Sequence, residues 1–208
     1  MRTLSMVVVS AALVSLPAHA TAQAVRSVGV AIGRLDSRQL QTRAPESRAR
    51  RATALGLHVH LETPRSWLGV GVGLTFSPRG GEHALSTPLG TDPLYGPVHA
   101  DYLTFSVLPA AYLPLGPLTL SLFAGPAVDV YLRGEAASEL TSGFRDPNPQ
   151  VLIAVAGFSA SVTGPGRVLL GVDLRLEEGL GSAYRLASER LRHRSRSISV
   201  LLGFRPTF

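Results

Sequence analysis

The sequence predicts an all-β fold: a closed antiparallel transmembrane β-barrel of about eight strands, with short periplasmic turns and longer extracellular loops. Three observations favour this fold. Apolar residues alternate with polar or small ones along short segments, short and long connections alternate, and one face of the segments is rich in glycine and serine. A soluble sandwich has no reason to alternate its connections in this way, whereas an outer-membrane barrel has tight turns at one end and longer loops at the other.

The N-terminal stretch has the three parts of a secretory signal peptide. Arg2 precedes an apolar run over 6–16, Pro17 ends that run, and Ala20 and Ala24 each close a small-x-small cleavage motif. The run is shorter than the about 20 residues that a membrane-spanning helix needs. The sequence therefore predicts a signal peptide over 1–24, cleaved after Ala20 or Ala24, and a barrel over 25–208 in the bacterial outer membrane.

Apolar side chains recur at every second position in the rest of the chain, as expected for strands with one face in lipid. The pattern is clearest over 118–133, 168–177 and 197–208, and similar segments cover 25–35, 51–62, 67–77, 101–113 and 150–162. The short connections are 63–66, 114–117 and 163–166, and the long ones are 36–50, 78–100, 134–149 and 178–194. Pro109 and Pro126 each delete a ladder donor in mid-strand, so we expect them to mark bulges or rim positions.

The two faces of these strands are predicted to meet different surroundings. The less apolar face carries many small residues, and Gly69, Gly71 and Gly73 on one segment are the plainest case. Inside a narrow barrel, small residues make room for a few large or charged side chains. We therefore expect the apolar face to meet lipid and the small-plus-charged face to line a lumen that side chains fill.

Two neighbouring segments carry a family likeness. Residues 102–116, YLTFSVLPAAYLPLG, followed by LFAGPA at 122–127, resemble the PorT-like outer-membrane β-barrel domain family, and the stretch from Gly157 to Gly181 looks like the penultimate hairpin of that family. Ser106 stands where the family often has proline, and Pro109 comes later than in the family pattern. The resemblance implies an outer-membrane location and is a poor guide to function.

The C-terminal residue is a second likeness, because outer-membrane barrels commonly end on an aromatic side chain that the assembly machinery recognises. Phe208 continues an evenly spaced row with Phe204, Leu202 and Val200. We therefore expect the barrel-assembly machinery to be a partner through Phe208.

The composition limits the chemistry that the chain can perform. All 20 basic residues are arginine, the formal net charge is +6, and the sequence contains no cysteine, which excludes disulfides and thiolate sites. Aromatic residues make up 6% of the chain and do not interleave with arginine, so nucleic acid is not expected as a partner. No motif indicates a cofactor, and the protein partners stay open.

Polar residues on the predicted inner face are expected to form a lumen charge network. Its members are His58, His60, Glu62, Asp129, Arg133, Asp173, Arg175, Glu177 and Arg205. Buried charges need partners, so we interpret the set as an interior salt-bridge network that fills the barrel. Two alternatives stay open, namely a metal site at His58, His60 and Glu62, and a proton or ion path.

Arginine is concentrated in and beside the first and last long loops. The candidates for contact with lipopolysaccharide or another anionic polymer are Arg48, Arg50, Arg51, Arg190, Arg192 and Arg194. The first and last strands become neighbours when a barrel closes, so the two basic loops should lie side by side, and guanidinium groups bind phosphate in fork geometry. The alternative is that these are ordinary solvated loops.

These features favour a non-enzymatic barrel with a structural or interaction role at the cell surface. A narrow channel for ions or small solutes is the first alternative. A lipid-modifying enzyme is the second, because Ser195, His193 and Glu189 lie close together in the sequence and could supply a nucleophile, a base and an orienting acid.

Overall fold

The computed structural model describes residues 25–40, 48–62, 67–85, 94–136, 148–182, 184–185 and 190–206. The predicted signal peptide with Ala20 and Ala24, and the C-terminal Phe208, lie outside these ranges, so the predictions made for them stay predictions.

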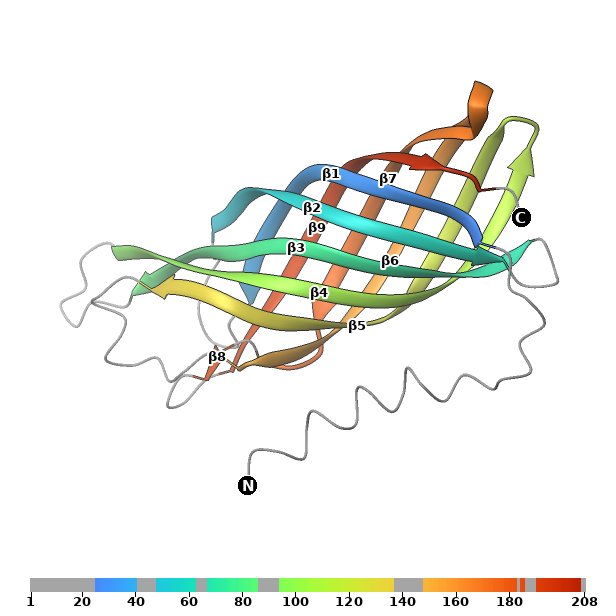
Figure 1. The fold of residues 1–208 in the computed structure, drawn as a ribbon. Coiled ribbons are helices and arrows are strands. Elements are labelled where there is room, and N and C mark those ends of the chain that lie inside the picture. The colour runs from blue at the N-terminus through green and yellow to red at the C-terminus, as the bar shows by residue number, and fades with distance from the viewer. Residues whose placement is uncertain are drawn as a thin grey trace.

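The described residues form eight long strands and one strand of two residues, all in one antiparallel sheet (Figure 1). The strands are β1 (Val25–Leu40), β2 (Arg48–Glu62), β3 (Leu68–Leu85), β4 (Leu94–Leu115), β5 (Leu118–Ala136), β6 (Gln150–Thr163), β7 (Val168–Gly179), β8 (Tyr184–Arg185) and β9 (Arg190–Phe204). A short 3-10 helix, η1 (Pro165–Arg167), joins β6 to β7. In the part of the chain described, no helix has the length and apolar character needed to cross a membrane.

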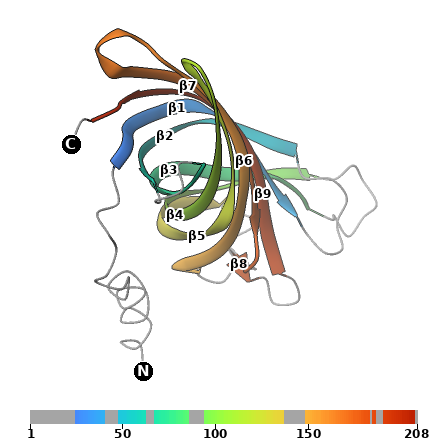
Figure 2. The ribbon, with the colours of Figure 1, turned by 90° about the vertical axis from the view of Figure 1, so that its right-hand side faces the viewer.

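The pairing of β1 with β9 closes the sheet. It runs without a register shift from Val28 opposite Phe204 to Leu40 opposite Arg192, and Figure 2 shows the strands wound around a common interior. Closure leaves no strand edge whose backbone N–H and C=O groups would face lipid unpaired. The predicted eight-stranded closed barrel is therefore confirmed, with β8 as a short addition beside β9.

The strands extend further toward the long loops than predicted. Residues 78–85 of β3 pair with 94–101 of β4, although the sequence placed 78–100 in a loop. In the same way β1 continues to Leu40, β2 begins at Arg48, and β9 begins at Arg190. The short connections at Gly116–Pro117 and 164–167 lie where they were predicted.

The outer wall of the barrel is apolar, as the alternation predicted. On β7 the even-numbered side chains point outward, and Leu176 is 65% exposed, whereas Asp173 and Glu177 on the other face are 5% exposed. The same division holds on β5, where Leu122 is exposed and Ser121 is buried. Because a wall of exposed leucine, valine and isoleucine is stable only against an apolar medium, this face is the lipid-contacting one.

Small residues on the inner face make room for large side chains, as predicted. A Cβ atom added to Gly157 on β6 would overlap the Phe123 ring from β5 and the backbone oxygen of Leu174. One added to Gly73 on β3 would lie 3.0 Å from Nδ1 of His58. Phe123 and His58 therefore lie over glycines of neighbouring strands, which leave room for their rings.

The two mid-strand prolines lie close together across the β4–β5 ladder. The pairs Ser106–Ala127 and Ala110–Phe123 bracket a stretch without ladder pairs, in which Pro109 and Pro126 both fall, and the register is the same on either side. The expectation that these prolines mark bulges or the rim is therefore wrong. Each lacks an amide proton, so the ladder is interrupted locally while β4 stays paired with β3 and β5 with β6.

The Gly157→Ala variant tests the packing of the interior. The added methyl group overlaps the Phe123 ring, so we expect the free energy of unfolding to fall by about 1–3 kcal/mol, the usual cost of overpacking. The Gly164→Ala variant is the matched control, because its new Cβ atom has the Val168 backbone oxygen at 3.8 Å as its nearest neighbour. Denaturant unfolding in vesicles measures both, and equal stabilities would contradict this account of the interior.

Candidate functional site

A buried arginine joins four strands across the loop-side part of the lumen. Arg79 on β3 is 1% exposed. Its Nη2 atom lies 3.1 Å from Oδ1 of Asp129 on β5 and 2.9 Å from Oε2 of Glu177 on β7. Its Nη1 atom donates a 2.9 Å hydrogen bond to Oγ of Ser195 on β9. The Arg79 side chain thus connects β3 to β5, β7 and β9, which lie far apart in the sequence.

Hydroxyl groups complete the shell around the two carboxylates. Thr104 donates a 2.6 Å hydrogen bond to Oδ1 of Asp129, and Ser195 donates a 3.0 Å hydrogen bond to Oε2 of Glu177. On the other side of Asp129, Nε2 of His193 lies 3.0 Å from Oδ2, in an orientation that does not meet hydrogen-bond geometry. A buried ion pair is tolerated when hydrogen bonds satisfy its remaining lone pairs, and this shell meets that condition for most of them.

A second cluster lies closer to the periplasmic end of the lumen. Arg175 on β7 donates hydrogen bonds of 2.6 and 2.9 Å to Oδ2 of Asp173. Its Nη2 atom also lies 3.2 Å from Nδ1 of His58 on β2. Below it, Nδ1 of His60 is 2.9 Å from the Tyr112 hydroxyl group on β4. These contacts join β2 to β4 and β7 across the interior.

The spaces left between these groups are the size of water. A cavity of about 10 Å³ lies beside His58, Arg175 and Glu177. A second cavity, of about 30 Å³, opens among the side chains near the short turns. One water molecule needs a cavity of at least about 10–15 Å³, so these two spaces hold about three waters at most. The lumen at these levels is therefore filled by side chains.

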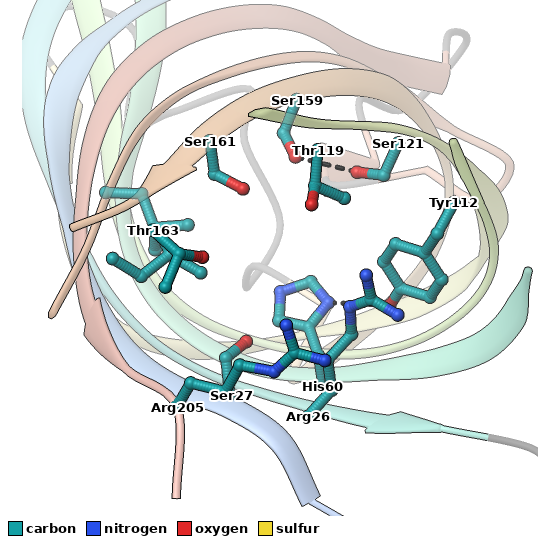
Figure 3. A pocket seen from close by; sticks show the side chains of 12 residues that line it. Arg26, Ser27, His60, Tyr112, Thr119, Ser121, Ser159, Ser161, Thr163 and Arg205 are labelled. Carbon is teal, nitrogen blue, oxygen red and sulfur yellow. Dashed lines mark hydrogen bonds between the residues drawn. The ribbon is translucent and has the colours of Figure 1, made fainter. Parts of the chain in front are cut away.

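The larger space is a vestibule at the periplasmic end, drawn in Figure 3. Hydroxyl side chains from β5 and β6 line one side of it, and Ser121 and Ser159 share a 2.7 Å hydrogen bond. His60, Arg26 and Tyr112 lie on the other side, with the Arg26 guanidinium 4.3 Å from the centre of the Tyr112 ring. The vestibule is polar but narrow, so it suits ordered water.

A different cluster lies on the outside of the barrel, toward the long loops. Asp36 on β1 is approached by three guanidinium groups: Nε of Arg34 at 3.1 Å, Nε of Arg51 at 3.8 Å and Nε of Arg196 at 3.6 Å. The side chains of the three arginines are 52%, 75% and 70% exposed. We call Arg34, Asp36, Arg51 and Arg196 the outer arginine cluster.

Strand register assembles this cluster. Asp36 is the ladder partner of Arg51 on β2 and also of Arg196 on β9, because β1 lies between these two strands. Arg34 precedes Asp36 by two residues and so shares its outward face. Immediately below, Ile32 and Ile198 are 56% and 53% exposed and belong to the apolar wall. The cluster therefore lies where the apolar wall ends on the loop side.

The predicted anion-contacting arginines lie on strand ends and not in loops. Arg51, Arg192 and Arg194 are exposed on the outer face, and Arg194 forms a 3.0 Å ion pair with Glu178. Arg50 points to the other face and is partly buried. The backbones of Arg48 and Arg190 are strand residues, but their side chains lie outside the described ones. The β1–β9 pairing places Arg38 opposite Arg194. Residues 41–47 and 186–189 lie outside the described ones, so the expectation that the two basic loops lie side by side stays a prediction.

The predicted lumen network is present in part. His58, Asp129, Asp173 and Glu177 are buried on the inner face, and His60 and Arg175 are partly buried there.

Two members of the predicted network lie elsewhere. The Arg133 side chain is 82% exposed and its Nε atom pairs with Oδ2 of Asp101 at 2.8 Å, because the strand has passed beyond the filled lumen at that height. Arg205 is exposed and lines the mouth of the vestibule. The Glu62 side chain lies outside the described ones.

Sequence reasoning missed the centre of the lumen network and the centre of the outer cluster. Arg79 was assigned to a loop, although it continues the inward row of Thr75 and Ser77 on β3. That continuing alternation was the available signal. Asp36 carries no such signal, because its importance follows from the register of β1 against two other strands.

The described residues also bear on the metal and enzyme alternatives. Within the described side chains, no three or more His, Cys, Asp or Glu residues are arranged to hold a metal ion. His193 and Ser195 are 1% and 2% exposed, and each contacts a different carboxylate, Asp129 and Glu177. Glu189 lies outside the described residues. The Ser195 hydroxyl group therefore donates to a carboxylate inside the packed lumen, and the lipid-modifying enzyme stays an untested alternative.

Known proteins share the fold of this chain without close sequence relationship. No family model and no curated protein matches it, so the resemblance to the PorT-like family stays a prediction. The outer membrane protein OprG from Pseudomonas aeruginosa superposes with a TM-score of 0.58 at 12% identity, over 89% of this chain and 98% of OprG. The outer membrane protease OmpT from Escherichia coli superposes with a TM-score of 0.50 at 9% identity, over 88% of this chain and 97% of OmpT. At these identities the likeness establishes the fold alone, which is that of bacterial outer-membrane β-barrels, and with its apolar outer wall the chain is an outer-membrane barrel.

The Arg79→Met variant tests the lumen network. It leaves Asp129 and Glu177 buried without their cation, so we expect the free energy of unfolding to fall by about 3–5 kcal/mol. A triple variant with Asp129→Asn and Glu177→Gln added should recover much of this loss, because it holds no unpaired buried charge. Fluorescence of the single tryptophan, Trp67, reports unfolding in vesicles.

The Arg194→Met variant is the control, because it breaks a pair with Glu178 that is exposed on both sides and should cost about 1 kcal/mol or less. A loss for Arg79→Met no larger than for this control would show that the buried network does not stabilise the barrel.

Proposed function

We propose that this barrel is a non-enzymatic, non-conducting protein of the outer membrane, and that the outer arginine cluster binds phosphate groups of lipopolysaccharide at the cell surface. The observation that carries the proposal is the arrangement of Arg34, Arg51 and Arg196 around Asp36. One carboxylate cannot neutralise three guanidinium groups, so an excess of two positive charges is held on a small area of the outer wall.

The position of the cluster supports a lipid phosphate as its ligand. Arg34 lies two residues above the exposed Ile32 on β1, and Arg196 lies two residues above the exposed Ile198 on β9, at the level where hydrocarbon gives way to polar headgroups. An anion at this level is partly desolvated, which strengthens its attraction to the guanidinium groups. Guanidinium also offers paired donors that match phosphate oxygens. A lipopolysaccharide molecule with its phosphate here keeps its acyl chains against the apolar wall.

The filled lumen supports a role other than conduction or catalysis. The network around Arg79 occupies the interior between β3, β5, β7 and β9, and the cavity next to it has a volume of about 10 Å³. Solute passage requires that these buried ion pairs separate, which leaves charges unpaired in a packed interior. The buried hydroxyl group of Ser195 donates to Glu177 while His193 lies against Asp129, an arrangement that supports a structural role for both side chains.

Replacing the arginines of the cluster tests the proposal. The triple variant Arg34→Gln, Arg51→Gln and Arg196→Gln should lower the affinity for lipopolysaccharide at least tenfold, because a hydrogen bond to a charged group contributes about 1.5–3 kcal/mol. The measurement is binding of purified lipopolysaccharide to the folded barrel in detergent. Added salt should weaken binding to the unchanged protein, because ionic strength screens exposed charges.

Two controls separate a site from a general charge effect. Arg167→Gln removes an exposed charge at the periplasmic turn, and Arg133→Gln removes one at the loop end of β5, away from β1. Both should bind lipopolysaccharide as the unchanged protein does. If the triple variant also binds unchanged, the outer arginine cluster is not the ligand site.

A further inference from the structure

A groove in the outer wall begins at the outer arginine cluster and continues over β7, β6 and β5. Its volume is about 520 Å³, within the range of about 300–1,000 Å³ that is usual for small-molecule sites. Its lining residues come from β1, β5, β6, β7 and β9: Arg34, Asp36, Leu122, Ala156, Gly157, Phe158, Leu174, Arg175, Leu176, Arg196, Ser197 and Ile198.

Two successive rows of ladder partners build the walls of this groove. The lower row contains Leu122, Phe158, Leu174 and Ile198 and ends at Arg34. The upper row contains Ala124, Ala156 and Leu176 and ends at Arg196 and Asp36. All of the apolar members are on the lipid-facing side of the sheet.

Small side chains make the wall concave here. Ala156 lies between Ala124 on β5 and Leu176 on β7, so β5 and β6 place two methyl groups next to each other where their neighbours carry leucine and phenylalanine. Two residues further along β6, Phe158 closes the groove with a large ring. The hollow therefore results from the small side chain of Ala156 beside the large ring of Phe158 on the outer face of β6.

Among the outward-facing side chains that line the groove, the charged ones lie at one end. Arg34 and Arg196 line it at the β1–β9 end, beside Asp36, and their side chains are 52% and 70% exposed. At the β5–β6 end the outward side chains are apolar, among them Leu122, which is 64% exposed. A ligand that fits has an anionic group at one end and a hydrocarbon chain that continues from it.

We propose that this groove holds one acyl chain of a phosphorylated glycolipid of the outer leaflet, the lipid A part of lipopolysaccharide, with its phosphate on Arg34 and Arg196. The proposal rests on the proposed function, and it adds a defined binding site for one lipid molecule. Bulk lipid touches all of the apolar wall, whereas this groove joins a concave apolar surface of four strands to a surplus of guanidinium groups. When one molecule occupies both subsites, the phosphate contact raises the local concentration of the chain at the groove.

Filling the groove separates the chain subsite from the phosphate subsite. In the Ala156→Leu variant a larger side chain occupies the hollow, and Ala156→Ile is a second variant of the same kind. Ala160→Leu is the matched control, because Ala160 belongs to the same strand and the same face but does not line the groove. All three changes point toward lipid, and heat-dependent gel migration checks that each barrel is folded.

The probes are fully acylated lipid A, the same phosphorylated sugar with its fatty acids removed, and inorganic phosphate. Native mass spectrometry of the barrel in detergent should show one tightly held lipid A. Ala156→Leu and Ala156→Ile should weaken lipid A binding at least fivefold and leave binding of the deacylated sugar unchanged, and Ala160→Leu should change neither. The double variant Arg34→Gln and Arg196→Gln should weaken both phosphorylated sugars.

The outcomes distinguish the two proposals. If Ala156→Leu and Ala156→Ile bind lipid A as well as Ala160→Leu does, the groove is not a chain subsite, while the phosphate proposal stands. If the double arginine variant binds both phosphorylated sugars unchanged, the proposed function itself fails. If inorganic phosphate displaces lipid A at equal concentration, the acyl chain adds nothing and the groove proposal is overturned.

Discussion

The pairing of β1 with β9 is the interaction on which the rest of the structure depends. It joins the first and last long strands over thirteen ladder pairs without a shift in register. A sheet left open at this seam would expose two rows of unpaired backbone groups to lipid, and each such group costs several kcal/mol in that medium. Closure removes that cost and creates an interior and an outer wall. Side chains must then fill the interior and suit the outer wall to lipid.

The interior is filled by paired charges and by large side chains, some of which lie over glycine. A barrel of about eight strands has little room inside, and Arg79, Asp129 and Glu177 share what remains with hydroxyl groups that complete their hydrogen bonds. The network is stable only as a whole, because removal of one charged side chain leaves its partners buried without an opposite charge. The outer wall shows the converse arrangement. There the seam between β1 and β9 brings Arg196 beside Asp36 and leaves positive charge unneutralised at the lipid boundary.

Most of the fold could be predicted from the sequence, because the alternation of apolar with polar or small residues indicates which face of each strand meets lipid. The outward row Val168, Leu170, Val172, Leu174 and Leu176 is visible in the sequence and exposed in the structure. The predicted strands stopped at residue 77 and began again at residue 101, so the paired ends of β3 and β4 and the buried position of Arg79 were missed. Arg133 was misplaced because alternation gives the face of a residue and not its height in the barrel. Asp36 and its three arginines could not have been predicted as a cluster, because their contact depends on the register of two separate ladders.

Register across the closing seam can be measured directly with introduced cysteines, because the natural chain has none. Ile32 and Val200 are ladder partners on the outer wall, and Cα atoms of directly opposed residues lie about 4.5–5.5 Å apart, within disulfide range. The Ile32→Cys, Val200→Cys pair should form a disulfide in the folded barrel under mild oxidation. The staggered pair Ile32→Cys, Leu202→Cys should not, because its Cα atoms are about 7–8 Å apart. A crosslink in the staggered pair instead, or in neither pair of a folded barrel, would contradict the closure that assembles both the lumen network and the outer arginine cluster.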